Sequence, residues 1–268
     1  MKMAYKIYLD AGHGGYDNGA QYNGRKEKDE ALDLALAVGN LLSKEGYDVH
    51  YTRTTDVYQS PTEKAQIANR NGADLFVSFH RNASQVPGTY DGVQTLLYDD
   101  SGIKAYMARN INDELEKVGF KNLGVSIRPN LAVLRQTDMP ALLVEVGFID
   151  SDKDNQIYDQ NFNEIAQAIA DGIADTLDEF QPRTGYAVQT GLFRNYANAL
   201  YELERLERMG FEAKIVPWKE YFAVQVGIVD TLEGARELEQ DLRKLGYDTL
   251  VVKETEIPQI QQENQNYL

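Results

Sequence analysis

Hydrophobic runs alternate with helical patterns through the first two thirds of the chain. Each run is short, rich in Val, Leu, Ile, Phe and Tyr, and bounded by Gly, Asp or Asn, which is typical of buried strands. The pattern predicts strands at "KIYLDAG" (6–12), "YDVHYTR" (47–53), "DLFVSFH" (74–80), "DGVQTLLY" (91–98), "NLAVLR" (130–135) and "PALLVEVGF" (140–148).

Between these runs the apolar spacing changes to that of helices, with segments at 30–44, 61–73, 103–118 and 162–180. The second of them carries a start signature: Ser60 as N-cap, Pro61 at the first helical position and Glu63 completing a capping box. Alternating strands and helices predict an α/β fold with a mostly parallel sheet flanked by helices. In such sheets, binding sites gather at the carboxyl ends of the strands.

The last third of the chain contains an internal repeat. "YAVQTG" (186–191) recurs as "FAVQVG" (222–227), and "RLERMGFEAKIV" (205–216) recurs as "DLRKLGYDTLVV" (241–252), both at an offset of 36 residues. Each copy has the pattern strand, helix, strand, so together they predict a small α+β domain of βαββαβ order with one sheet face exposed. We expect a first domain at 1–180, a linker at 181–185, the repeat domain at 186–253 and a flexible polar tail at 254–268.

Composition removes several functional classes. A formal net charge of −15 disfavours general binding of nucleic acid or anionic membranes, because such binding needs a basic face. With no cysteine in the chain, disulfides and thiolate metal sites are excluded. No apolar stretch is long enough to span a bilayer, and the N-terminus enters the first strand without a signal-peptide core, so we expect a chain that the general secretory route does not export.

Two of the three histidines occupy matching places in the predicted sheet. His13 follows the first strand and His80 ends the third, so both emerge at the same sheet edge, whereas His50 lies within a strand and is expected to be structural. Two imidazoles and one carboxylate are a common catalytic zinc set. The third donor remains open at this point, with candidates Asp10, Asp17, Glu27, Asp29, Glu30 and Glu145.

Glu145 is unusual because it is an acid inside the apolar run "PALLVEVGF". Burying an unpaired charge is costly, which favours a functional reason for its position. Next to a metal, this carboxylate would take a proton from an activated water and return it to a leaving amine. The alternative is a buried salt bridge with an arginine such as Arg53 or Arg135.

Five segments resemble, in order, the motifs of zinc-dependent N-acetylmuramoyl-L-alanine amidases: "IYLDAGHGGYDNGA", "RKEKDEALDLA", "YTRTTD", "LFVSFHRNAS" and "LAVLRQTDMPALLVEVGFID". The resemblance implies Zn²⁺ ligands at His13, Glu27 and His80, with Glu145 as the catalytic glutamate. It also implies hydrolysis of the amide between the lactyl group of N-acetylmuramic acid and the L-alanine of the peptidoglycan stem peptide. Asn82 and Arg135 are then candidates for substrate contacts.

The C-terminal repeat is similar to the SPOR domain, which implies binding to peptidoglycan glycan strands. Its candidate glycan contacts are Tyr186, Gln189, Phe193, Phe222 and Gln225. The alternating Val188 and Val224 are expected in the core, and Val229 stands where the first copy has Phe193.

Together these features predict a monomeric cell-wall hydrolase carried to peptidoglycan by a glycan-binding module. Two alternatives stay open: a noncatalytic peptidoglycan-binding protein and a zinc peptidase acting on stem peptides. Without a signal peptide, the expected roles are those of a phage endolysin or a mother-cell lytic enzyme of sporulation. Such an enzyme is made in the cytoplasm and reaches the wall through a holin or after lysis.

Overall fold

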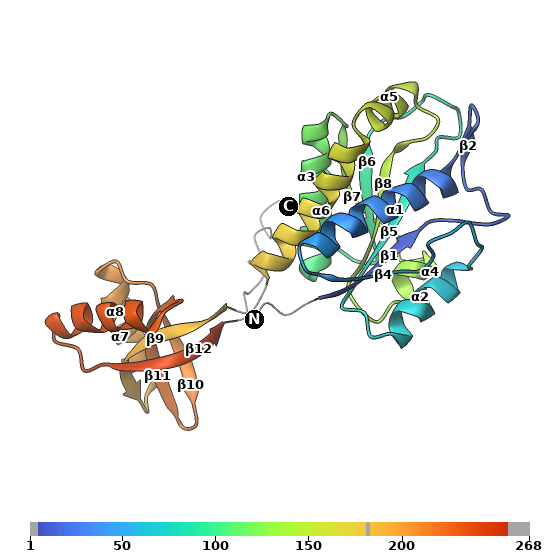
Figure 1. The fold of residues 1–268 in the computed structure, drawn as a ribbon. Helices are drawn as coiled ribbons and strands as arrows, with labels where there is room; N and C mark the ends of the chain where they lie inside the picture. The colour runs from blue at the N-terminus through green and yellow to red at the C-terminus, as the bar shows by residue number, and fades with distance from the viewer. Residues whose placement is uncertain (1–4, 181–182, 257–268) are drawn as a thin grey trace. The chain divides into compact units, whose positions relative to one another are not determined.

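The chain divides into two compact units, and the boundary in the sequence lies between Glu179 and Phe180. In the computed structural model, residues 5–180 and 183–256 are described, and each unit is considered by itself (Figure 1). None of the described helices is both long and apolar enough to cross a membrane.

The first unit is built on a six-stranded sheet of order β4-β1-β5-β8-β6-β7. All neighbouring strands are parallel except β6 and β8, which confirms the expected mostly parallel α/β fold. The parallel β1, β5 and β8 therefore end at one edge, where His13 and His80 both lie. The strands are β1 (Lys6–Ala11), β4 (Asp48–Tyr51), β5 (Leu75–Asn82), β6 (Val93–Leu97), β7 (Asn122–Ile127) and β8 (Ala141–Phe148).

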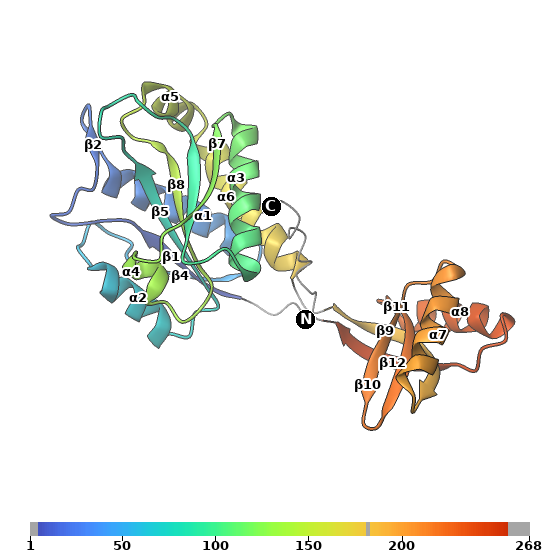
Figure 2. The same ribbon diagram turned by 180° about the vertical axis from the view of Figure 1, so that it is seen from behind.

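Helices cover both faces of this sheet (Figures 1 and 2). The larger core lies under α1 (Glu27–Lys44), α3 (Gly102–Val118) and α6 (Phe162–Glu179). On the other face, α2 (Pro61–Arg70) and α4 (Ala132–Arg135) pack on a smaller cluster that includes Phe76 and Leu143. Side chains alternate along a strand, so His80 and Glu145 share this second face.

Local signals were accurate at one helix and misleading at another segment. Ser60 and Glu63 form the expected capping box. The strand expected at 130–135 is wrong, because Ala132–Arg135 forms α4, while an unexpected strand, β7, lies at Asn122–Ile127. A six-residue apolar run does not distinguish strand from buried helix by periodicity.

Polar composition concealed two further elements of the first unit. Helix α5 (Asp152–Gln160) follows β8 and is mostly polar, so it carries no clear apolar period. A short hairpin of β2 (Gln21–Tyr22) and β3 (Arg25–Lys26) leads directly into α1, which begins three residues before the expected Glu30.

The second unit has the expected βαββαβ order. Its antiparallel sheet, of order β10-β11-β9-β12, packs one face on two helices around Val188, Val224 and Val226. The elements are β9 (Arg183–Phe193), α7 (Tyr196–Arg208), β10 (Ala213–Trp218), β11 (Tyr221–Val229), α8 (Leu232–Lys244) and β12 (Leu250–Glu256).

Strand boundaries extend beyond the expected repeat domain at both ends. Residues 183–185, expected in the linker, begin β9, and residues 254–256, expected in the tail, end β12. The rest of the expected linker, 181–182, and of the expected tail, 257–268, lies outside the described residues.

Candidate metal centre and active site

Three side chains meet at the carboxyl edge of the first sheet. His13 follows β1, His80 lies near the end of β5, and Glu27 is the first residue of α1. Their donor atoms lie within 4.8 Å of one another, and within residues 5–180 and 183–256 they form the only group of this kind. Topology thus brings together two histidines 67 positions apart in sequence.

Glu27 is the centre of this group. Its Oε1 lies 2.8 Å from His80 Nδ1 and its Oε2 lies 3.0 Å from His13 Nε2. The backbone N–H of Ala20 donates to Oε2 at 2.8 Å, so the carboxylate is held in place as well as buried. The other ring nitrogen of His13, Nδ1, lies 2.9 Å from Asp17, which sets the orientation of the imidazole.

The pKa shifts in this group favour an ionised Glu27 together with positive charge on the histidines beside it. Burial alone would raise the pKa of Glu27, but its contacts with His13 and His80 outweigh burial and lower that pKa. Burial opposes protonation of His13, yet hydrogen bonds and charge from Glu27 and then Asp17 raise its pKa to about 9. One carboxylate between two imidazoles is a donor set that suits a divalent cation such as zinc, which would compete with these protons.

The loop that carries His13 is packed tightly against the His80 side chain. A Cβ on Gly12 would lie 2.5 Å from Cε1 of His80, so only glycine fits against this imidazole. His13 itself adopts a left-handed φ of 57°, a conformation that costs energy for a non-glycine residue. The neighbouring structure must therefore hold this loop in place.

Two buried cations supply that support, and sequence reasoning did not identify their role. Arg53 donates to the carbonyls of Ala11 at 3.1 Å and Gly12 at 2.8 Å. Lys64 donates to the Ala11 carbonyl at 2.5 Å and pairs with Asp10 at 2.9 Å. A lysine on the otherwise small, buried face of α2 was the available signal, because a buried cation requires a partner.

The other acids considered as third donor have different places. Asp10 lies beneath the loop, where Thr52 and Ser78 each donate to it at 2.6 Å in addition to its pair with Lys64. Glu30 pairs with Arg25 and Arg81, and Asp29 is exposed. Asp17 contacts His13 but does not belong to the three-donor group.

Glu145 lies directly opposite His80 in the β5–β8 register. Its Oε2 is buried and has no hydrogen-bond partner among the described residues. Burial raises the pKa of this carboxyl to about 7, although the charge of His80 opposes the rise. In the described part of the chain neither Arg53 nor Arg135 forms the salt bridge considered as the alternative, since Arg53 binds carbonyl oxygens and Arg135 is exposed at the end of α4.

The remaining sequence candidates of the first unit lie apart from the donor group. Asn82 accepts a hydrogen bond from the backbone of Ala83, which makes a local turn at the end of β5. No contact of the described residues joins Asn82 or Arg135 to the donor group. As expected for a structural residue, His50 stacks on Tyr8 at 5.2 Å and contacts Asp48.

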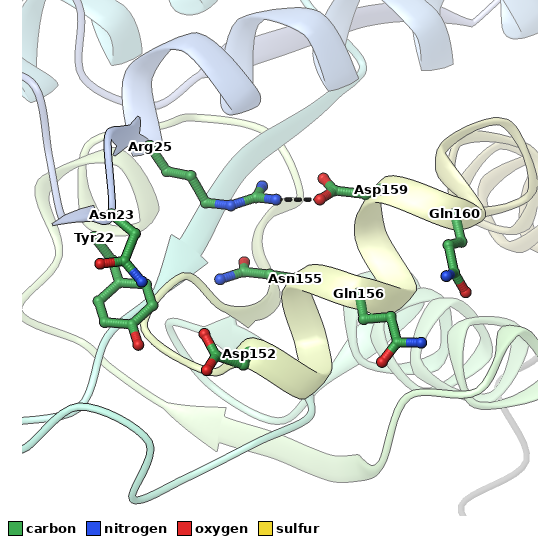
Figure 3. Close-up of a pocket in the computed structure, with 8 residues that line it drawn as sticks. All are labelled: Tyr22, Asn23, Arg25, Asp152, Asn155, Gln156, Asp159 and Gln160. Atoms are coloured by element: carbon green, nitrogen blue, oxygen red, sulfur yellow. Dashed lines mark hydrogen bonds and ion pairs between the residues drawn. The ribbon is translucent and has the colours of Figure 1, made fainter.

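A polar pocket of about 380 Å³ lies between the β2–β3 hairpin and α5 (Figure 3). Its lining includes none of the three donors and not Glu145. One of its walls is tied to the donor group, because Arg81, which follows His80, donates to Asn155 at 2.8 Å. The ion pair of Arg25 with Asp159, drawn in Figure 3, anchors the hairpin to α5. We assign this region a role in holding the segment that precedes Glu27.

In the second unit, the structure separates residues that the sequence interpretation had grouped. Gln189 and Gln225 pair directly across β9 and β11, on the sheet face opposite the helix-covered core. Phe193 and Phe222 instead pack against that core as partly buried side chains, on the side opposite the two glutamines. Phe222 is an odd number of positions from Gln225, and an irregularity in β9 turns Phe193 to the same side. Tyr186 is half-buried opposite Val229 and Lys253.

The Lys64–Asp10 pair yields a stability prediction. Replacing Lys64 by Met would leave Asp10 as an uncompensated buried charge, so we expect the free energy of unfolding to fall by about 3 kcal/mol. Lys64 and Asp10 are only 3% and 0% exposed, so solvent screening is small. Denaturant unfolding measures the loss, and Lys117→Met, at an exposed ion pair, is the matched control with a change within about 0.5 kcal/mol.

The same pair predicts how that difference depends on pH. Burial would raise the pKa of Asp10, but the charge and hydrogen bond of Lys64, with those of Ser78 and Thr52, hold it below its ordinary 3.8. The stabilisation is therefore complete above that pH and is lost as the pH falls below it. Equal stability of Lys64→Met and wild type at neutral pH would contradict this assignment.

A mostly parallel α/β sheet carries two imidazoles and two carboxylates at its carboxyl edge, an arrangement suited to metal-assisted hydrolysis. Residues 7–175 match the N-acetylmuramoyl-L-alanine amidase family, Amidase_3, and residues 182–253 match the SPOR domain. The chain therefore belongs to the N-acetylmuramoyl-L-alanine amidase family, which confirms the resemblance. It is an enzyme that hydrolyses peptidoglycan, and its SPOR domain is of a class that binds peptidoglycan.

Relatives and solved structures agree with this membership. The chain is 37% identical to the N-acetylmuramoyl-L-alanine amidase CwlM of Bacillus licheniformis, covering 79% of this chain and 84% of CwlM. It is 35% identical, with the same coverage, to the sporulation-specific N-acetylmuramoyl-L-alanine amidase of Bacillus subtilis strain 168. An endolysin of Bacillus phage SPP1 is 38% identical over 66% of this chain and 67% of its own. The N-acetylmuramoyl-L-alanine amidase of Clostridium difficile 630 superposes with a TM-score of 0.60 at 33% identity, covering 65% of this chain and 97% of that structure.

Proposed function

We propose that this amidase binds one zinc ion through His13, Glu27 and His80 and uses Glu145 as its general base and acid. The bond cleaved is the amide between the lactyl group of N-acetylmuramic acid and the L-alanine of the stem peptide. The observation that carries the proposal is the clustering of the three donors within 4.8 Å at a strand end directly opposite Glu145.

The chemistry divides between the cation and the protein. When bound, zinc supplies Lewis acidity that activates water and polarises the scissile carbonyl. The Glu145 carboxyl, whose pKa burial raises to about 7, is suited both to accept a proton and to donate one near neutral pH. It takes the proton of the attacking water on Oε2 and passes it to the alanine nitrogen, which leaves as an amine. Asp17, Arg53 and Lys64 hold His13 and its loop in position during this cycle.

Product analysis tests the reaction and separates it from the alternatives. Digestion of purified walls by the intact chain, followed by mass spectrometry, is expected to yield whole stem peptides with a free L-alanine amine. Fragments cut within the stem peptide would instead indicate a peptidase. No released fragment with the zinc-loaded protein would indicate a noncatalytic binding protein.

For the C-terminal unit, we propose that the sheet face opposite the helices contacts the glycan strand at Gln189, which is partly exposed there. Its cross-strand partner Gln225 is only 4% exposed and supports Gln189 from beside it. Side-chain amides are suited to sugar hydroxyl and acetamido groups because they both donate and accept hydrogen bonds. Lys214 is the cross-strand neighbour of Gln225 on β10 and so borders the same face. Tyr186 precedes Gln189 on β9 and is half-buried, and we propose it as a further glycan contact at the margin of this sheet face.

A single substitution tests this surface. In a Glu145→Gln background, which keeps the walls intact, Gln189→Ala is expected to weaken co-sedimentation with purified walls roughly three- to tenfold, the effect of a lost hydrogen bond. Gln240→Ala is the matched control, since Gln240 is exposed on α8, on the helix-covered side of the sheet. Equal binding by the two variants would contradict the assignment of this face.

The biological setting is also a proposal. Two relatives are named as a phage endolysin and a sporulation-specific amidase, and both names describe enzymes of lysis or wall remodelling. We propose one of these two settings for this chain, with access to the wall through a holin or after lysis. A neighbouring holin gene would favour the first setting, and a sporulation promoter would favour the second.

A further inference from the structure

An exposed pair of stacked tyrosines lies on the loops that follow β1 and β4, the first of which also carries His13, and the mechanism does not use it. The rings of Tyr16 and Tyr58 lie 4.2 Å apart at an interplanar angle of 28°. Tyr16 is 79% exposed and Tyr58 is 40% exposed, with Val57 exposed between the two loops. A tyrosine ring presents a large apolar face and a polar hydroxyl, so an exposed stacked pair offers a surface for a ligand that has both apolar and hydroxyl groups.

The pair is connected directly to His13. Gly14 and Asp17 close a tight turn through two backbone hydrogen bonds of 3.0 and 3.1 Å, and Tyr16 lies at its tip. The side chain of Asp17, at the end of the same turn, contacts the His13 ring. Tyr16 is therefore held by the same turn whose Asp17 orients a proposed ligand.

Several contacts make this surface rigid before any substrate arrives. The Gly15 N–H donates to Asp56 at 2.7 Å, and the buried Lys28 ammonium bridges Asp56 and the Gly15 carbonyl. Gly15 has a left-handed φ of 60°, and a Cβ there would lie 2.8 Å from the Tyr58 nitrogen, so the two loops are in close contact. A preformed surface binds without an ordering cost.

The chemistry of the pair selects one part of the substrate. The scissile amide joins a sugar to a peptide, and a sugar ring presents apolar C–H faces that pack on aromatic rings, while its hydroxyls bond to phenol groups. The two rings themselves are uncharged phenols, and Asp56, which binds the Gly15 N–H beside them, is paired with Lys28. The negative charges that act on the Tyr16 hydroxyl are those of Asp17 and Glu63.

We propose that Tyr16 and Tyr58 form a carbohydrate platform of the catalytic domain, which binds a sugar ring of the glycan strand during cleavage. The platform rests on the proposed amidase reaction and adds to it a subsite on the sugar side of the bond. It is a second glycan-binding surface, and its binding of sugar does not depend on the sheet face of the C-terminal unit. Its consequence is a preference for substrates that retain their glycan.

Competitive inhibition by the two halves of the substrate tests the platform in the full-length protein. One inhibitor is the peptide-free disaccharide that contains N-acetylmuramic acid, and the other is the free stem peptide. Tyr16→Ala and Tyr58→Ala are expected to raise the Ki of the disaccharide about fivefold, the effect of one lost aromatic contact, and to leave the Ki of the peptide unchanged. Competition at the active site excludes binding to the C-terminal unit as the cause.

Tyr98→Ala is the matched control. Tyr98 is 42% exposed, close to the value for Tyr58, and it follows β6, whose antiparallel direction places its end at the opposite edge of the sheet. Unchanged disaccharide inhibition in both platform variants, no competition by the disaccharide in wild type, or a rise confined to the peptide would each overturn the proposal. Failure of the amidase reaction itself is distinguishable, because the wild-type protein would then release no peptide at all.

Discussion

Replacement of Glu145 by Gln is expected to lower kcat/KM for wall hydrolysis by roughly 100- to 10,000-fold, the usual contribution of a general acid–base group. The amide side chain would keep the shape of the carboxyl group but would neither take the proton of the attacking water nor return one to the alanine nitrogen. Release of dye from labelled walls measures the loss. A fall of less than about tenfold would contradict the assigned role.

Two further measurements separate this loss from a structural defect. Zinc content is expected to stay at the wild-type value, because Glu145 lies outside the three-donor group. Thermal stability is expected to be unchanged or higher, because the substitution replaces a buried ionisable carboxyl group by a neutral amide of the same shape. Loss of zinc or a large fall in Tm would assign Glu145 to the architecture of the site instead.

Replacement of His13 by Ala is expected to weaken zinc affinity by more than about 100-fold and to abolish wall hydrolysis. The substitution removes one of only three protein donors, a larger change than the loss of a supporting hydrogen bond, which alone costs roughly 10- to 100-fold. Equilibrium dialysis followed by metal analysis measures the affinity. Wall binding is expected to persist, because the SPOR domain belongs to a separate unit.

His50→Ala is the matched control for this experiment. His50 is also a histidine of the first sheet, but it stacks on Tyr8 and is outside the donor group. It is expected to retain both zinc and hydrolysis. A His13→Ala protein that still binds zinc with wild-type affinity would exclude His13 as a ligand.

Simple periodicity predicted much of the site. The position of His80 at the end of one apolar run, and of Glu145 as an acid inside another, indicated that both lie at the carboxyl edge of a parallel sheet, and the β5–β8 register places them opposite each other. The choice of Glu27 over Glu30 was not available from the residues alone, since both acids begin the same helix. The structure distinguishes them because Glu30 is engaged by Arg25 and Arg81, on the side away from the histidines.

Features that depend on contacts between distant loops were not predictable. The support of the His13 loop by Arg53 and Lys64, and the stacking of Tyr16 on Tyr58, join segments about 40 to 50 residues apart whose contacts no local pattern encodes. In the second unit, a bulge in β9 changes which side chains face the helices, so that Phe193 packs against the core, and the repeat in the sequence does not indicate this bulge.

Zinc titration of the metal-free, full-length protein tests the central claim most directly. Hydrolysis of purified walls, followed by the release of peptides with a free L-alanine amine, is expected to rise in proportion to bound zinc and to saturate at one ion per chain. Glu27→Gln, which alters the central donor while keeping its size, is expected to remove this response. Full hydrolysis by the zinc-free wild-type protein would contradict the account.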